Sequence, residues 1–241
     1  MIASTRLAFA QFSRQPFPFV WSSIIYVVLQ LLFLFSCIGL FLIYFFVASV
    51  LGVKVGLNTI PTMIVLGIIV LLLLFFSNGL NAGLMKSYHG ALEGRKTTVA
   101  EFLRHSLSKS LVMMVIMLLR DVAFLLVAAP AAALYYFFLA GITYMDYLTG
   151  LYILFVLFFI HFLFTPAFIS AGTFGTEFIQ SLKNGFYFLR RNHINAFGLY
   201  ILFAIIWILN FVPLLQLATI LAVYPIVYSG LILMFQAGHQ R

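Results

Sequence analysis

The sequence predicts an all-α protein: a polytopic membrane bundle of six transmembrane helices with three interfacial amphipathic helices. Two observations predict this class. Of the 241 residues, 65% are hydrophobic and 7% are charged, against roughly 25% charged residues in soluble domains, so a single water-soluble core cannot bury the apolar surface. The apolar stretches are also long and continuous, without the alternation of a membrane β-barrel, so helices are the expected spanning elements.

The first third of the chain predicts an interfacial helix followed by two spans. In residues 1–16, apolar side chains recur at helical spacing and arginines lie on other faces, as in a helix at the membrane surface. Residues 19–51 carry no charge, and residues 60–78 form a second apolar run; each is long enough to cross a hydrocarbon core of ~30 Å. Gly79 and Gly83 permit a neighbouring helix to approach closely.

The middle of the chain predicts a second amphipathic helix and then the third span. Residues 82–109 are the longest polar stretch, and within them Thr98 and Glu101 have the spacing of a capping box. Apolar side chains repeat behind this start, so we expect an amphipathic helix there. The third span is residues 111–139, bent or interrupted at Pro130, because proline removes a backbone donor.

The last part of the chain predicts three more spans around a third amphipathic helix. The fourth span is residues 148–169. Thr173 is a candidate cap for a helix over residues 178–189, which has an apolar side and a basic side. The fifth and sixth spans, residues 194–211 and 214–235, are separated only by a tight turn and are expected to form a hairpin.

The distribution of Lys and Arg predicts the orientation of the spans. If both termini and the polar segments 82–109 and 171–193 face the cytoplasm, every basic residue lies inside except Lys54, in an outer loop, and Arg120, in a span. Cytoplasmic loops of membrane proteins carry such an excess of Lys and Arg. We therefore expect six spans in the plasma membrane with both termini cytoplasmic.

Two similar segments indicate an internal repeat. Glu101–Leu103 and Glu177–Ile179 each begin an amphipathic helix that two spans follow, and the N-terminal helix has the same place before the first two spans. The single membrane domain, residues 1–241, is therefore interpreted as three tandem units, 1–92, 93–170 and 171–241. The alternative is that any polar loop between two spans looks amphipathic.

Four polar side chains are expected near the middle of the membrane: Gln30, Arg120, Asp121 and His161. An unpaired Arg and Asp at helix centres would together cost about 5–7 kcal/mol, because each costs roughly 2.5–3.5 kcal/mol. Adjacent helical positions point about 100° apart, so Arg120 and Asp121 need not bridge each other, and His161 is a candidate partner for Asp121. The group is either a structural clamp, which we favour, or a relay for protons or a small solute.

Basic residues near the ends of the spans are candidates for contacts with lipid head groups. These are Arg14, Lys109, Arg190 and Arg191. Each contributes about 1 kcal/mol of attraction near an anionic membrane surface. General anchoring is the simpler interpretation of these four residues, and recognition of a specific lipid is the alternative.

The residue patterns of common enzymes and cofactor sites are missing from the sequence. The five acidic residues are scattered, and there is no His-x-x-x-His pair, glycine-rich phosphate loop or Gly-x-Ser-x-Gly elbow. Cys37 is the single cysteine, so it cannot form an intrachain disulfide. We therefore expect no catalytic residue, no metal site and no cofactor. Nucleic acid is not an expected partner, because the basic residues lie between apolar runs rather than in one soluble patch.

The expected function is that of a non-catalytic integral membrane protein. Its expected partners are membrane lipids and other membrane-protein subunits, or a second copy of the chain. The alternative is a transporter or channel for protons or a small solute, which would use the polar residues in the middle of the membrane.

Three short motifs resemble a known group of proteins. Phe164–Ile169, Gln180–Lys183 and Arg190–Asn192 resemble segments of poorly characterised six-span membrane proteins of archaea and bacteria. These include relatives of the membrane domain attached to some glycerophosphodiester phosphodiesterases. The resemblance covers about residues 160–235 and implies a compact helical bundle. No phosphodiesterase catalytic domain is present in this sequence, so the resemblance implies no such activity here.

Overall fold

The computed structural model describes residues 2–52, 56, 59–140, 142–209 and 219–239, and every regular element in these ranges is helical. The elements are α1 (Ile2–Arg14), α2 (Pro16–Val50), α3 (Ile60–Leu92), α4 (Val99–Leu134), the π-helix η1 (Tyr135–Leu139), α5 (Met145–Phe174), α6 (Phe178–Leu209), the π-helix η2 (Thr219–Val223) and α8 (Tyr224–His239). The predicted all-α class is confirmed. Among the described residues, five segments are long and apolar enough to cross a membrane: α2, α3, α4 with η1, α5, and η2 with α8.

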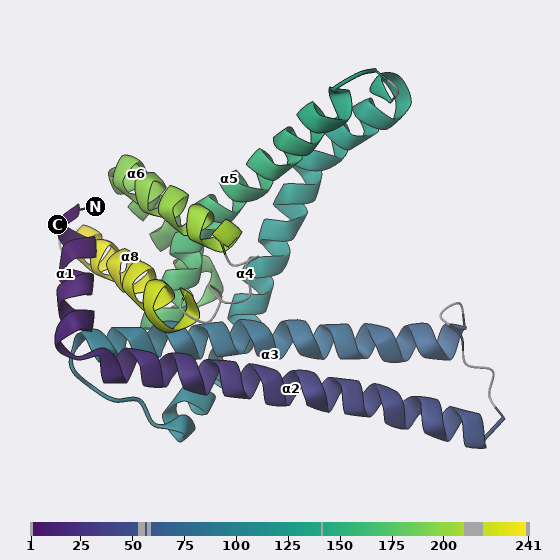
Figure 1. The fold of residues 1–241 in the computed structure, drawn as a ribbon, viewed down its shortest axis with the longest axis horizontal. Coiled ribbons are helices and arrows are strands. Elements are labelled where there is room, and N and C mark those ends of the chain that lie inside the picture. Colours follow the sequence, from purple (N-terminus) through teal and green to yellow (C-terminus); the bar gives the residue numbers. More distant parts are fainter. Residues whose placement is uncertain (1, 53–55, 57–58, 141, 210–218, 240–241) are drawn as a thin grey trace.

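Two long helical hairpins diverge from a common body. Helices α2 and α3 form one hairpin, and α4 and α5 form the other, which points in a different direction (Figure 1). Helices α1, α6 and α8 belong to the body, and both ends of the chain lie there (Figure 1). The described helices therefore do not form one parallel bundle, unlike the compact bundle that the family resemblance implies.

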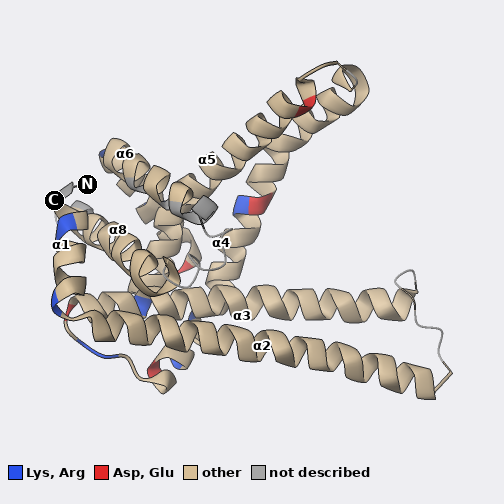
Figure 2. Ribbon diagram, in the orientation of Figure 1, with Lys and Arg blue, Asp and Glu red and all other residues tan. Residues whose placement is uncertain are grey.

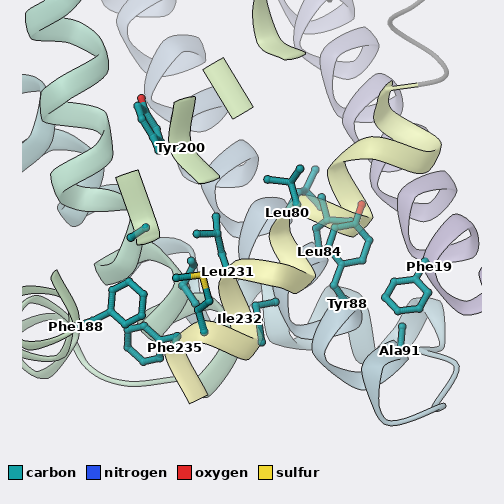
Figure 3. Packing of buried hydrophobic residues seen from close by; sticks show 14 of the residues in the cluster. Phe19, Leu80, Leu84, Tyr88, Ala91, Phe188, Tyr200, Leu231, Ile232 and Phe235 are labelled. Atoms are coloured by element: carbon teal, nitrogen blue, oxygen red, sulfur yellow. The ribbon is translucent and has the colours of Figure 1, made fainter. Parts of the chain in front are cut away.

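Burial is concentrated where the hairpins meet the body, which explains why the hairpins can diverge. Phe19 of α2, Tyr88 of α3 and Phe235 of α8 are almost fully buried and belong to one hydrophobic cluster (Figure 3). Beyond Ile25, by contrast, α2 buries only Cys37 and Ala48. Because the outer halves of the helices bury few side chains against the rest of the chain, packing does not force them to be parallel.

Helices α3 and α4 approach closely at Gly79 and Gly83, as predicted. A Cβ at Gly79 would lie 2.8 Å from the Ser106 carbonyl oxygen, and one at Gly83 would lie 2.9 Å from Phe102 Cε1. Such distances are shorter than ordinary van der Waals contacts, so only glycine fits at this crossing without a shift. Ser110 also faces Gly79, and its hydroxyl donates to the Ser106 carbonyl at 2.8 Å.

The predicted capping box begins α4. The Glu101 amide donates to Thr98 Oγ1 at 3.2 Å, and the Thr98 amide donates to Glu101 Oε2 at 2.9 Å. The helix does not end before the third span, however, but continues into it, and its total length is 36 residues. The expected amphipathic helix is therefore the first part of a single helix. Pro130 does not interrupt it, and the backbone becomes π-helical only at η1.

The prediction that Thr173 caps the third amphipathic helix is wrong. Thr173 is fully buried inside the last turn of α5, which ends at Phe174 and is followed by Gly175 with a φ of 69°. Glycine adopts this left-handed conformation without the steric cost of a side chain, so α5 ends immediately before Gly175. Thr173 lies before this end and therefore does not cap the start of the next helix. Helix α6 begins at Phe178 and contains a non-helical residue, Asn192, between the predicted amphipathic helix and the predicted fifth span.

The N-terminal helix is separate from the first span, as predicted. Gln15 has non-helical angles (φ −140°, ψ 71°), so α1 ends before α2 begins. Helix α1 packs mainly against α8. The end of the predicted fifth span, the turn at Pro213 and the start of the predicted sixth span lie outside the described residues.

Candidate functional site

Arg120 and Asp121 form an ion pair near the middle of α4. Arg120 donates to Asp121 Oδ1 from Nε at 2.8 Å and from Nη2 at 2.6 Å. Adjacent helical side chains point in different directions, so the sequence alone did not predict that these two side chains pair. The guanidinium has five N–H donors on a long side chain, so it can fold back to its neighbour.

His161 of α5 binds Arg120 and not Asp121, the partner expected from the sequence. Arg120 Nη1 lies 3.1 Å from His161 Nδ1. Because a guanidinium only donates hydrogen bonds, Nδ1 is the acceptor and the ring proton of a neutral His161 is on Nε2. Thr165, one turn along α5, donates to the His161 carbonyl at 2.8 Å. Arg120 therefore links α4 to α5.

Two aromatic rings complete the surroundings of this cluster. The Arg120 guanidinium carbon lies 5.9 Å from the centre of the Phe168 ring. The Tyr200 ring of α6 lies 6.0 Å from the His161 ring. Neither residue was predicted from the sequence. The spacing of seven between His161 and Phe168 puts them on one helix face, whereas no local signal points to Tyr200.

Gln30, the fourth predicted member, is on the other hairpin. Its Nε2 donates to Ser77 Oγ at 2.9 Å, and this bond links α2 to α3. The structure therefore places Arg120, Asp121 and His161 together and gives Gln30 a separate role within the α2–α3 hairpin. The sequence could place these residues at a similar depth but could not show that the hairpins diverge.

Asp121 lies at the surface of its hairpin. Its side chain is 45% exposed, compared with 22% for Arg120. Arg120 donates both hydrogen bonds to Oδ1, and none of the described residues donates a hydrogen bond to Oδ2. The ion pair thus leaves one carboxylate oxygen without a hydrogen bond from the described residues, in the part of α4 after Ser110, which carries no other charge.

The four predicted head-group contacts differ in their surroundings. Arg14 and Arg190 are exposed on α1 and α6, and Arg191, also exposed, stacks its guanidinium on the Tyr187 ring at 4.6 Å. Lys109 is half-buried and donates to the carbonyl of Gly175. A lysine at this position complements the carboxyl end of α5, so Lys109 has a structural role that the sequence did not indicate.

No group of His, Cys, Asp and Glu side chains in the described ranges is arranged to hold a metal ion. Cys37 is buried on α2. No family model, curated protein or solved structure matches the chain. The resemblance to membrane domains of glycerophosphodiester phosphodiesterases therefore stays a prediction, and the geometry of the site carries the functional argument.

Proposed function

We propose that the chain is a non-catalytic, multi-pass protein of the plasma membrane that assembles with membrane-protein subunits through its α4–α5 hairpin. The observation that carries this proposal is the half-exposed carboxylate of Asp121 in the part of α4 after Ser110, which is apolar apart from the Arg120–Asp121 pair. The partner is a transmembrane segment that offers a hydrogen-bond donor to Asp121 Oδ2. It is either a second copy of this chain or another subunit.

The surroundings of Asp121 support this proposal. Large apolar side chains of both hairpins are exposed, including Phe46 (71%) and Phe137 (72%). Charged residues gather on the body, whereas the hairpins are almost free of charge outside the Arg120–Asp121 pair (Figure 2). Lipid tails can cover the exposed apolar surface. They do not satisfy a carboxylate, which costs about 2.5–3.5 kcal/mol at the centre of a membrane helix.

The proposed topology has six spans and both termini in the cytoplasm. The ends of the chain lie at the body, and the tips of both hairpins lie far from it (Figure 1), an arrangement that suits cytoplasmic basic loops and outer hairpin tips. The second part of α6 and the segment from η2 into α8 supply the last two spans. The three units 1–92, 93–170 and 171–241 are proposed to be tandem repeats of one helix and one hairpin.

Cysteine labelling tests the topology. A single cysteine is placed at residue 146, near the tip of the α4–α5 hairpin, on a Cys37→Ser background. A membrane-impermeant maleimide is expected to label it from the outside. Labelling from the cytoplasmic side only would contradict the six-span topology.

Native mass spectrometry of protein extracted in gentle detergent with its lipids tests the assembly. The wild-type chain is expected in a larger complex, with itself or another subunit. Asp121→Asn should weaken the association constant by about tenfold or more, because a hydrogen bond to a charged group contributes about 1.5–3 kcal/mol. Asp146→Asn is the matched control, since it removes the same charge from an exposed position. A lone monomer in every gentle detergent, or an equal effect of both substitutions, would refute the proposal.

The second candidate function is transport of protons or a small solute. It is favoured by the direct contact of Arg120 with both Asp121 and His161 across two helices, which is typical of intramembrane proton relays. Flux into liposomes separates it from assembly, with wild type compared with Asp121→Asn and His161→Ala. Loss of flux with unchanged thermal stability would establish a relay. An absence of wild-type flux, with both variants destabilised, would assign the cluster to packing.

A further inference from the structure

A basic cavity of about 420 Å³ lies where α3 is connected to α4. Its walls come from the last turns of α3, the connecting segment 93–98 and the first turns of α4. The basic side chains that line it are Lys86, Arg95, Lys96, Arg104 and His105. This cavity lies on the body and shares no lining residue with the Arg120 cluster or with the four predicted head-group contacts.

Positive charge in the cavity is only partly compensated. Glu101 is the one acidic residue of the described lining, and its carboxylate is held by the Thr98 amide in the capping box. Arg95 pairs with Glu93, and the hydrogen bond from Arg95 lowers the pKa of the Glu93 carboxyl. Among the described residues, Lys86 and Arg104 form no ion pair. These two exposed cations leave the cavity with an excess of positive charge.

Ser87 contributes a buried hydroxyl without a partner. Serines in helices commonly donate to the carbonyl one turn earlier, and Ser23 does so in this chain, with Phe19 as acceptor at 3.2 Å. Ser87 lines the cavity and is fully buried, yet its Oγ has no hydrogen-bond partner among the described residues. A desolvated hydroxyl in this state is destabilising unless something binds it.

The wall formed by the connecting segment is held in place by α2. Trp21 Nε1 donates to the Thr97 carbonyl at 3.2 Å. Lys96 Nζ lies 4.8 Å from the ring centres of both Phe17 and Trp21. On the opposite side, His105 Nε2 is 2.6 Å from the Gly172 carbonyl of α5. The cavity is therefore built by contacts among four helices and exists before any ligand arrives, which reduces the entropy lost on binding.

We propose that this cavity binds a phosphate group, carried by a lipid head group or by a small water-soluble phosphate ester. Lys86 and Arg104 neutralise its charge, and a change of rotamer turns the Ser87 hydroxyl, which is closed to solvent in the free protein, toward a phosphate oxygen. Arginine and lysine are the side chains that bind phosphate most often, arginine by its planar set of donors and lysine as a point charge. The cavity is larger than a single phosphate, so it also has room for the group to which the phosphate is esterified.

Two binding measurements on the intact, purified protein distinguish the sources of the phosphate. Isothermal titration with inorganic phosphate and with glycerol 3-phosphate, on protein in uncharged nanodiscs, measures binding from water. Native mass spectrometry of protein incubated with dioctanoyl phosphatidic acid measures binding of a lipid phosphate. Binding is expected in at least one measurement, and the stronger ligand identifies the source.

Substitutions then locate the site. Lys86→Gln and Arg104→Gln should each weaken binding by about tenfold, because each removes a charge-assisted hydrogen bond, and Ser87→Ala should weaken it less. Both basic residues are exposed, so the variants are expected to fold. Arg6→Gln removes one exposed charge from α1, away from the cavity lining and from the predicted head-group contacts, and is the control. The proposal is overturned if neither phosphate nor lipid binds, if the cavity variants bind like wild type, or if the control loses affinity equally.

The result does not depend on subunit assembly, because the site lies apart from Asp121. Phosphate binding by the monomeric protein would support the cavity proposal even if the assembly proposal failed. An Asp121→Asn variant is expected to bind phosphate like wild type, and loss of binding in that variant would contradict a separate site.

Discussion

Replacing Gly79 by alanine should destabilise the contact between α3 and α4. The new methyl group would meet Ser110 Oγ and would lie 2.8 Å from the Ser106 carbonyl oxygen. The Ser110 side chain can rotate away at the cost of its bond to that carbonyl. The carbonyl itself belongs to the backbone of α4, so the helices must separate by several tenths of an ångström to restore an ordinary contact.

The expected magnitude follows from two opposing effects. Overpacking of a tight contact costs about 1–3 kcal/mol. Alanine is about 0.8–1.0 kcal/mol more favourable than glycine inside a helix. Gly67, on the same helix, has no atom within 4 Å of a built Cβ, so Gly67→Ala should show only the favourable effect. The free energy of unfolding of Gly79→Ala should therefore be about 1–3 kcal/mol lower than that of Gly67→Ala.

Unfolding of the purified protein in mixed detergent micelles, with increasing fractions of a denaturing detergent, measures this difference. The comparison within one helix removes the common effect of detergent on helix propensity. If Gly79→Ala is as stable as Gly67→Ala, the close approach of α3 and α4 at this position is wrong.

Two further substitutions test other parts of the body. Phe235→Ala should lower the free energy of unfolding by about 3–5 kcal/mol, because its ring is buried and lies 5.2 Å from the Phe188 ring. Phe138→Ala is the control, because this ring is 76% exposed. It should change the free energy of unfolding little in the same detergent titration. Thr98→Ala should lower it by about 0.5–2 kcal/mol through loss of the cap of α4, and restoration by Thr98→Ser, with a similar hydroxyl, distinguishes capping from packing. An unchanged Phe235→Ala would mean that α8 does not pack in the body, and a neutral Thr98→Ala would remove the capping box.

Local signals in the sequence predicted the elements that depend on neighbouring residues. Long uncharged runs indicated helices that can cross a membrane, the spacing of Thr98 and Glu101 indicated the start of α4, and Gly79 with Gly83 indicated a tight crossing. The last two signals act within one or two turns of helix, and the first acts within a single helix. The error at Thr173 has the same local origin, because Gly175, two residues later, is a stronger signal for the end of a helix.

Contacts between distant residues were decided only by the tertiary structure. The contact of Arg120 with His161 and the separation of Gln30 from both depend on which helices form each hairpin and on how the hairpins diverge. The proposed phosphate cavity likewise depends on a connecting segment that α2 holds in place, so that Lys86 of α3 and Arg104 of α4 line the same cavity. Composition and periodicity specify which face of a helix is apolar, but the packing of large side chains in the body determines which faces meet.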